Sequence, residues 1–159
     1  MTILAIGFLI IPMLVQGKST KLVFDATEWT DDSLVPPAPT IVFFEDGIMH
    51  IKDYWSMHLL GGTIGDDEIT GWTQSLFHAK IDLATGNLVV NGQTWFYFTW
   101  GELTGYFTGT INAKIVGGVL TGMYTLHGYE DFDGMKLFGT LWNIDAKTNG
   151  FDGTVLIPN

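Results

Sequence analysis

The chain has 159 residues, of which 47% are hydrophobic and 14% aromatic, enough to bury the core of one domain. Its 7 basic and 17 acidic side chains give a formal net charge of −10, and every basic residue is lysine, which argues against nucleic-acid binding. The absence of cysteine excludes disulfides, thiolate zinc sites and iron–sulfur clusters.

An apolar run occupies residues 3–15 and is interrupted by Gly7 and Pro12. As a helix it would span about 20 Å, short of the roughly 30 Å of a bilayer core. The small Gly17 follows it, although no basic residue precedes the run. We expect residues 1–17 to be a secretory signal peptide or a short N-terminal anchor, and the protein to be secreted or held at the cell surface. An ordinary buried segment is the third interpretation.

Residues 18–159 are predicted to form a single β-domain, because hydrophobicity alternates with period two and no stretch keeps helical spacing. Loops are expected at residues 30–40, which contain three prolines, and at residues 61–67, which contain three glycines. Hairpin turns are predicted at Asp46-Gly47, Thr85-Gly86, Gly101-Glu102 and Gly117-Gly118, since glycine supplies the positive φ of such turns.

These turns predict which residues face one another across the strands. They pair Phe44 with Met49, Thr73 with Phe98, Trp100 with Leu103 and Ile115 with Leu120, and two later loops pair Leu126 with Gly139 and Leu141 with Val155. All place large apolar residues and glycines on one face. Inward glycines mark curvature or close approach. Eight to nine strands in sequential order therefore predict an all-β, up-and-down antiparallel β-barrel, with a β-sandwich as the alternative.

Glycine and threonine recur together beside hydrophobic residues in Phe107-Thr108-Gly109-Thr110, Leu120-Thr121-Gly122-Met123, Phe138-Gly139-Thr140 and Asp152-Gly153-Thr154. With the Gly-Gly hairpin, this pattern resembles the calycin-like barrels of the allene oxide cyclase and dirigent group, over roughly residues 65–157. The resemblance implies a secreted or organellar barrel that encloses an apolar or phenolic ligand, often as a trimer. No catalytic residue of those families matches a position here. The preference of threonine for strand exteriors is the plainer explanation.

Several side chains are predicted to point into the barrel and to form a ligand pocket: Asp53, Trp55, Phe96, Phe98, Trp100, Tyr124 and Asn143. Asp53 is notable because a carboxylate on an apolar face is costly unless it is paired. It could act as a general acid or base, anchor a ligand, or simply be hydrogen-bonded near the barrel mouth. A solid core filled by side chains is the alternative to a pocket.

On the opposite face, apolar and aromatic residues gather on neighbouring strands: Trp72, Leu76, Trp95, Tyr97 and Tyr106. A free monomer seldom exposes so much apolar surface. We expect this patch to be an interface in a homo-oligomer. Cover by the N-terminal segment and binding of a glycan are the alternatives.

We expect neither a metal nor a cofactor, because the histidines do not cluster and the acidic loop 130–134 lacks the full calcium pattern. The first functional hypothesis is a cofactor-free barrel that binds a small apolar ligand, self-assembles, or both. The second is a cyclase or isomerase that uses one acid, Asp53 or Glu102. The third is a structural surface protein. A membrane contact is expected only if residues 1–17 are retained.

Overall fold

The computed structural model of the chain describes residues 19–30, 41–145 and 147–158. The predicted signal peptide and the loop with three prolines lie outside the described residues, except for Thr30. The strands are β1 (Thr20–Trp29), β2 (Ile41–Glu45), β3 (Ile48–Ile64), β4 (Asp67–Asp82), β5 (Leu88–Trp100), β6 (Leu103–Val116), β7 (Val119–Glu130), β8 (Lys136–Asn143) and β9 (Thr148–Ile157). The described part of the chain contains no helix long and apolar enough to cross a membrane.

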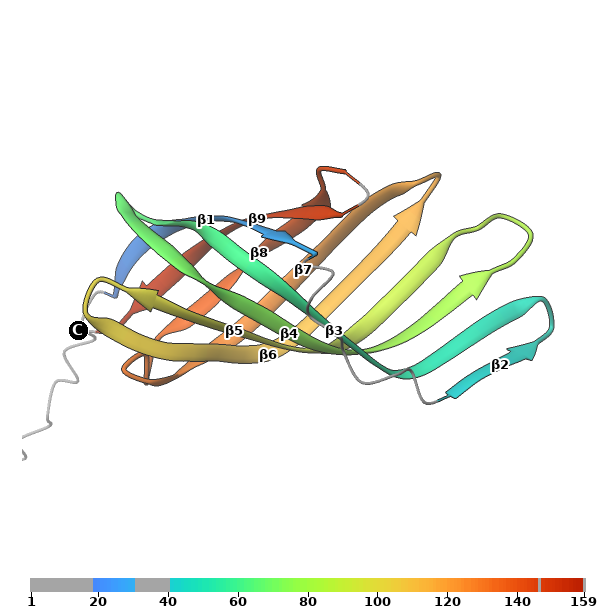
Figure 1. The fold of residues 1–159 in the computed structure, drawn as a ribbon, viewed down its shortest axis with the longest axis horizontal. Helices are drawn as coiled ribbons and strands as arrows, with labels where there is room; N and C mark the ends of the chain where they lie inside the picture. The colour runs from blue at the N-terminus through green and yellow to red at the C-terminus, as the bar shows by residue number, and fades with distance from the viewer. Residues whose placement is uncertain (1–18, 31–40, 146, 159) are drawn as a thin grey trace, which may run out of the picture.

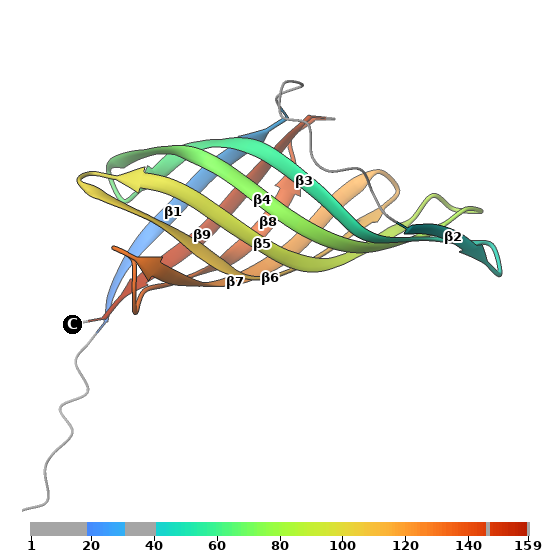
Figure 2. The same cartoon turned by 60° about the horizontal axis from the view of Figure 1, so that its bottom comes forward.

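All nine strands belong to one antiparallel sheet, which β1 closes by pairing with β9 on one edge and with β3 on the other. The result is an eight-stranded barrel made of β1 and β3–β9 (Figures 1 and 2). The extra strand β2 pairs only with the first residues of β3 and projects beyond one end of the barrel. The predicted barrel is confirmed, and the β-sandwich is not the fold.

Three of the predicted turns set the register as expected. Phe44 faces Met49 in the first hairpin. Trp100 faces Leu103, and the glycine-glycine turn between β6 and β7 places Ile115 opposite Leu120. Both glycines of that turn have positive φ, at 59° and 83°, as the prediction requires.

The other three hairpins are shifted by an even number of residues. In β4–β5, Thr73 faces Phe96 rather than Phe98. This turn is longer than predicted because Asp82 caps it, with its carboxylate Oδ1 accepting from the backbone N–H of Ala84 at 2.8 Å and its carbonyl accepting from Gly86 at 2.7 Å.

The hairpins at the C-terminal end are shifted in the same manner. Leu126 faces Leu137 rather than Gly139, and Leu141 faces Phe151 rather than Val155. Because side chains alternate with period two, an even shift leaves every residue on its predicted face. The predicted faces of these strands are therefore correct although the partners are not.

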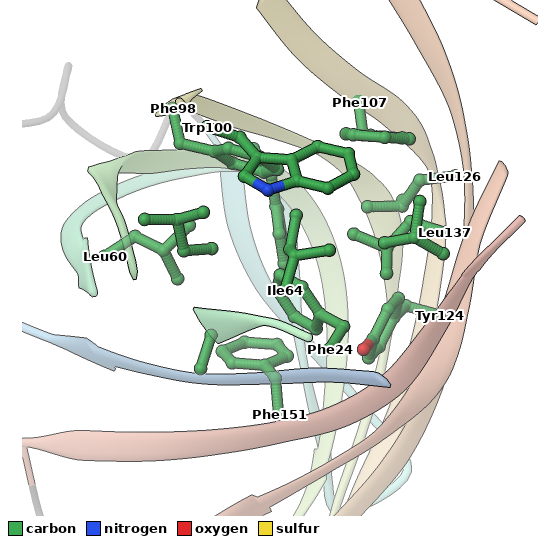
Figure 3. Close-up of a cluster of buried hydrophobic side chains, with 14 of the residues drawn as sticks. Phe24, Leu60, Ile64, Phe98, Trp100, Phe107, Tyr124, Leu126, Leu137 and Phe151 are labelled. Carbon is green, nitrogen blue, oxygen red and sulfur yellow. The ribbon is translucent and has the colours of Figure 1, made fainter. Parts of the chain in front are cut away.

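Large aromatic side chains fill the end of the barrel at which β1 begins and β9 ends (Figure 3). Phe132, in the loop between β7 and β8, is fully buried and folds inward, with its ring centroid 5.1 Å from those of both Phe98 and Phe107. Nearby, the Trp100 indole N–H donates to Asp67 Oδ2 at 3.0 Å. This end is consequently closed by packed side chains.

Gly139 provides a test of the close approach that barrel curvature demands. A Cβ atom at this position would lie 2.6 Å from Gly153 Cα and 2.7 Å from the Tyr124 hydroxyl, and would also meet the Asp152 carbonyl oxygen. We expect Gly139→Ala to lower the free energy of unfolding by about 1–3 kcal/mol, measured by urea denaturation. The exposed neighbour Thr140, changed to alanine, is the control. If Gly139→Ala were as stable as wild type, the close approach of the strands at this position would not require glycine.

Candidate ligand-binding site

A cavity of about 360 Å³ opens at the end of the barrel away from Phe132. Its volume lies within the range of roughly 300–1,000 Å³ that is typical of small-molecule sites. Strands β3–β6 continue past the closed ring at this end (Figure 1). Their inward side chains form one wall of the cavity. The barrel is therefore filled at one end and hollow at the other, so the two predicted alternatives, a pocket and a solid core, each describe half of it.

The outer part of the cavity is lined by aliphatic side chains. They alternate along β3–β7 with residues that face outward, and all are half-buried: Ile51, Ala79, Ile81, Leu88, Val90, Ala113, Ile115 and Leu120. Phe96 and Phe151 line the cavity too and belong to the buried core. Such a surface favours an apolar molecule, because both lose contact with water on binding.

One acid, Glu28, lines the cavity and is only 8% exposed. It lies on the inward face of β1, two residues beyond the buried Ala26. Its Oε2 accepts from the Thr73 hydroxyl at 2.7 Å, and its Oε1 accepts from the Asn149 amide at 2.9 Å. Both carboxyl oxygens are thus hydrogen-bonded, which offsets part of the cost of burying this group.

Four hydroxyl side chains line the cavity together with Glu28: Tyr54, Ser56, Ser75 and Thr94. Ser75 and Thr94 hydrogen-bond to each other at 2.7 Å, and Thr94 also donates to the Gln74 carbonyl at 3.1 Å. Ser56 faces Ser75 across β3 and β4 and is 7% exposed. Among the residues that the structure describes, none hydrogen-bonds to Ser56 Oγ. The cavity therefore contains a buried hydroxyl with unused hydrogen-bonding capacity.

Of the seven predicted pocket residues, Phe96 lines the cavity. Phe98, Trp100 and Tyr124 point inward as predicted, but they belong to the packed core. Asn143 supports the rim instead, since its Oδ1 accepts from the backbone N–H of Leu120 at 2.8 Å.

The predicted inward orientation of Asp53 and Trp55 is wrong. The β3–β4 register shifts between Ile51 and Tyr54, and Asp53 has a φ of 55°. This β-bulge adds a residue and reverses the faces after it. Trp55 consequently stacks on Trp95 on the outer surface, at 5.9 Å between centroids, and Asp53 Oδ1 lies 4.0 Å from His78 Nδ1 outside the barrel.

The predicted interface residues do lie together on the outer surface, and each is half-buried: Trp72, Leu76, Trp95, Tyr97 and Tyr106. Three of them form a row of contacting rings with Tyr129. Trp72 stacks on Tyr97 at 4.0 Å between centroids, Tyr97 and Tyr106 are tilted against each other at 5.2 Å, and Tyr106 stacks on Tyr129 at 5.2 Å. Burial raises the pKa of the Tyr97 phenol, and the neighbouring Tyr106 and Glu130 raise it further. The rings thus cover one another in part.

Within the described ranges, no group of three or more histidine, aspartate or glutamate side chains is placed to hold a metal ion. In the acidic loop 130–134, the carboxylates of Asp131 and Asp133 instead accept hydrogen bonds from backbone N–H groups of a neighbouring strand and of the loop itself. Asp131 Oδ2 accepts from the N–H of Thr104 at 2.9 Å, and Asp133 Oδ1 accepts from that of Gly134 at 3.0 Å.

The sequence prediction missed Glu28 and Ser56 as site residues. The alternation of Phe24, Ala26 and Glu28 could have revealed the first, because it places all three on one face of the strand. Ser56 could not be found in this way, because its orientation depends on the bulge.

The fold and the site together define a closed antiparallel β-barrel with one hollow, apolar end. A comparison with models of known protein families finds no match, and a comparison with curated proteins finds none either.

Tyr124 gives the core a predictable response to alkaline pH. Its hydroxyl donates to the Asp152 carbonyl at 3.0 Å, and its pKa is raised, first by burial and then by the Asp152 charge. In the unfolded chain a tyrosine ionises near pH 10, so above that pH the folded state holds more protons and stability falls. We expect Tyr124→Phe to remove this contribution, about 1.4 kcal/mol per pH unit above 10.

The measurement is urea denaturation of wild type and Tyr124→Phe at pH 9 and pH 11. The stability deficit of the variant should be smaller at pH 11 than at pH 9. The control is Tyr129→Phe, because Tyr129 is exposed on the outer surface. An unchanged deficit would contradict the assignment.

Proposed function

We propose that the protein binds a small apolar molecule in the open end of the barrel and needs no cofactor to do so. The observation that carries this proposal is the cavity of about 360 Å³ lined by half-buried aliphatic side chains. Removing these side chains and a ligand from water stabilises a complex by about 25 cal/mol per Å² of apolar surface. The packed core at the other end supports the barrel without the ligand.

Filling the cavity should abolish this binding. Ala79 lies inside it between Ile51 and Val90, and a tryptophan at this position would occupy the space. We expect Ala79→Trp to weaken binding of the neutral fluorophore 1-aminoanthracene by roughly tenfold or more, measured by fluorescence titration. The matched control is Lys80→Trp, on the outer face of the same strand. Equal binding by wild type and Ala79→Trp would exclude the cavity as the site.

The enzyme hypothesis, a cyclase or isomerase, now depends on Glu28 rather than on the acids predicted from the sequence. Asp53 lies outside the barrel, and Glu102 is exposed in the turn between β5 and β6. Glu28 is the acid in the cavity lining and could take the role of general acid or base.

Membership of the allene oxide cyclase and dirigent group is a finer proposal. It is supported by the closed eight-stranded barrel and by the inward glycines that let strands approach closely, such as Gly109 and Gly139. Secretion, with residues 1–17 as signal or anchor, is proposed on the sequence pattern alone.

We also propose that the outer aromatic row mediates self-association, since contacting rings on neighbouring strands offer a broad apolar surface to a second copy. We expect the double variant Trp95→Ser, Tyr97→Ser to sediment as a monomer and wild type as an oligomer. Val23→Ser, on β1, is the control because Val23 is exposed on another part of the outer surface. A monomeric wild type, or an unaltered sedimentation coefficient in the double variant, would contradict this role; a glycan then becomes the candidate partner.

A further inference from the structure

The Ser56 hydroxyl is a polar contact that the barrel offers to a ligand. It lines the cavity, is more than nine-tenths buried and has no hydrogen-bond partner among the described residues. The neighbouring hydroxyls of Ser75 and Thr94 satisfy each other. A buried hydroxyl without a partner is unfavourable, so a ligand group that hydrogen-bonds to Ser56 gains affinity in addition to apolar contact.

Glu28 determines which polar group fits beside Ser56. Its two oxygens each accept a hydrogen bond from a neutral side chain, so no basic side chain balances this acid through a hydrogen bond. Thr73, one of the donors, faces His58, and Ser56 is the next inward residue on β3. His58 and Ser56 are thus adjacent inward positions on β3, about 7 Å apart along the strand, and both line the cavity together with Glu28. A ligand carboxylate would be repelled there, and the net charge of −10 acts in the same direction.

The lining of the cavity indicates the chemical character of the rest of the ligand. The open part of the cavity is mainly aliphatic, with the exposed Tyr54 as a polar exception, so a cationic head group would have to leave water and pass a largely apolar surface to reach Ser56. A hydroxyl is neutral and can donate a hydrogen bond to Ser56 Oγ, which an ether oxygen cannot do. Resting on the proposed binding function, we infer that the ligand is an apolar alcohol with an aliphatic body, whose hydroxyl lies at the buried end against Ser56 Oγ and beside Glu28.

The test compares four probes of similar length that differ in the head group: 1-nonanol, methyl octyl ether, nonanoate and nonylammonium. Each displaces 1-aminoanthracene from the full chain at pH 7, and the affinities are compared. We expect 1-nonanol to bind about tenfold more tightly than methyl octyl ether, which lacks a donor, and more tightly than both charged probes. This comparison on wild type needs no variant and so does not depend on the folding of one.

Two variants assign the effect to residues. Ser56→Ala should reduce the preference for 1-nonanol over methyl octyl ether from about tenfold to about twofold. Glu28→Gln should tighten nonanoate binding by about tenfold, because the repelling charge is gone. The matched controls are Met57→Ala, next to Ser56 on the outer face, and Asp25→Asn, exposed on β1. Both should retain the wild-type order of affinities.

The outcomes separate this inference from the proposed function. If 1-aminoanthracene does not bind to wild type at all, the proposed function itself fails. If it binds but 1-nonanol and methyl octyl ether displace it equally, the proposed binding function is retained and the inference that the ligand is an alcohol is wrong. Tighter binding of nonanoate or nonylammonium than of 1-nonanol would likewise contradict the inference that the ligand is an alcohol.

Discussion

The structure depends on β1, which closes the sheet by hydrogen-bonding along both of its edges. Ten register pairs join it to β9, and the six from Phe24 to Trp29 also join it to β3. Because the sheet is closed, the eight strands of the barrel have no unpaired edge along the ring, and their inward side chains are enclosed. A sheet that coils so tightly needs inward positions without side chains, which is why glycine recurs opposite large rings, as Gly139 does beside Tyr124.

Unequal strand lengths divide that interior into two parts. β3 and β4 have 17 and 16 residues, whereas β8 has 8. The long strands therefore extend past the ring and leave their inner face half-covered, while the loop residue Phe132 fills the other end. The same inward alternation thus produces a packed core at one end and a ligand-sized space at the other.

A single β-bulge decides the polarity of the cavity. Without the extra residue between Ile51 and Tyr54, the inner face of β3 would carry Asp53 and Trp55. With it, Ser56 turns inward and Trp55 joins the outer aromatic surface. Among the described residues, the cavity lining then holds the hydrogen-bonded acid Glu28 without a second carboxylate, which would cost desolvation energy and repel the first.

Alternation and turn residues in the sequence alone determined the fold class and, outside the bulge, the face of each strand whose partner was predicted, because even register errors do not change sidedness. The exact partners required the tertiary structure, since turn length depended on local caps such as that of Asp82. So did the site. Glu28 meets Thr73 and Asn149, which are 45 and 121 residues away in the chain, and only closure of the barrel brings such distant side chains within hydrogen-bond distance.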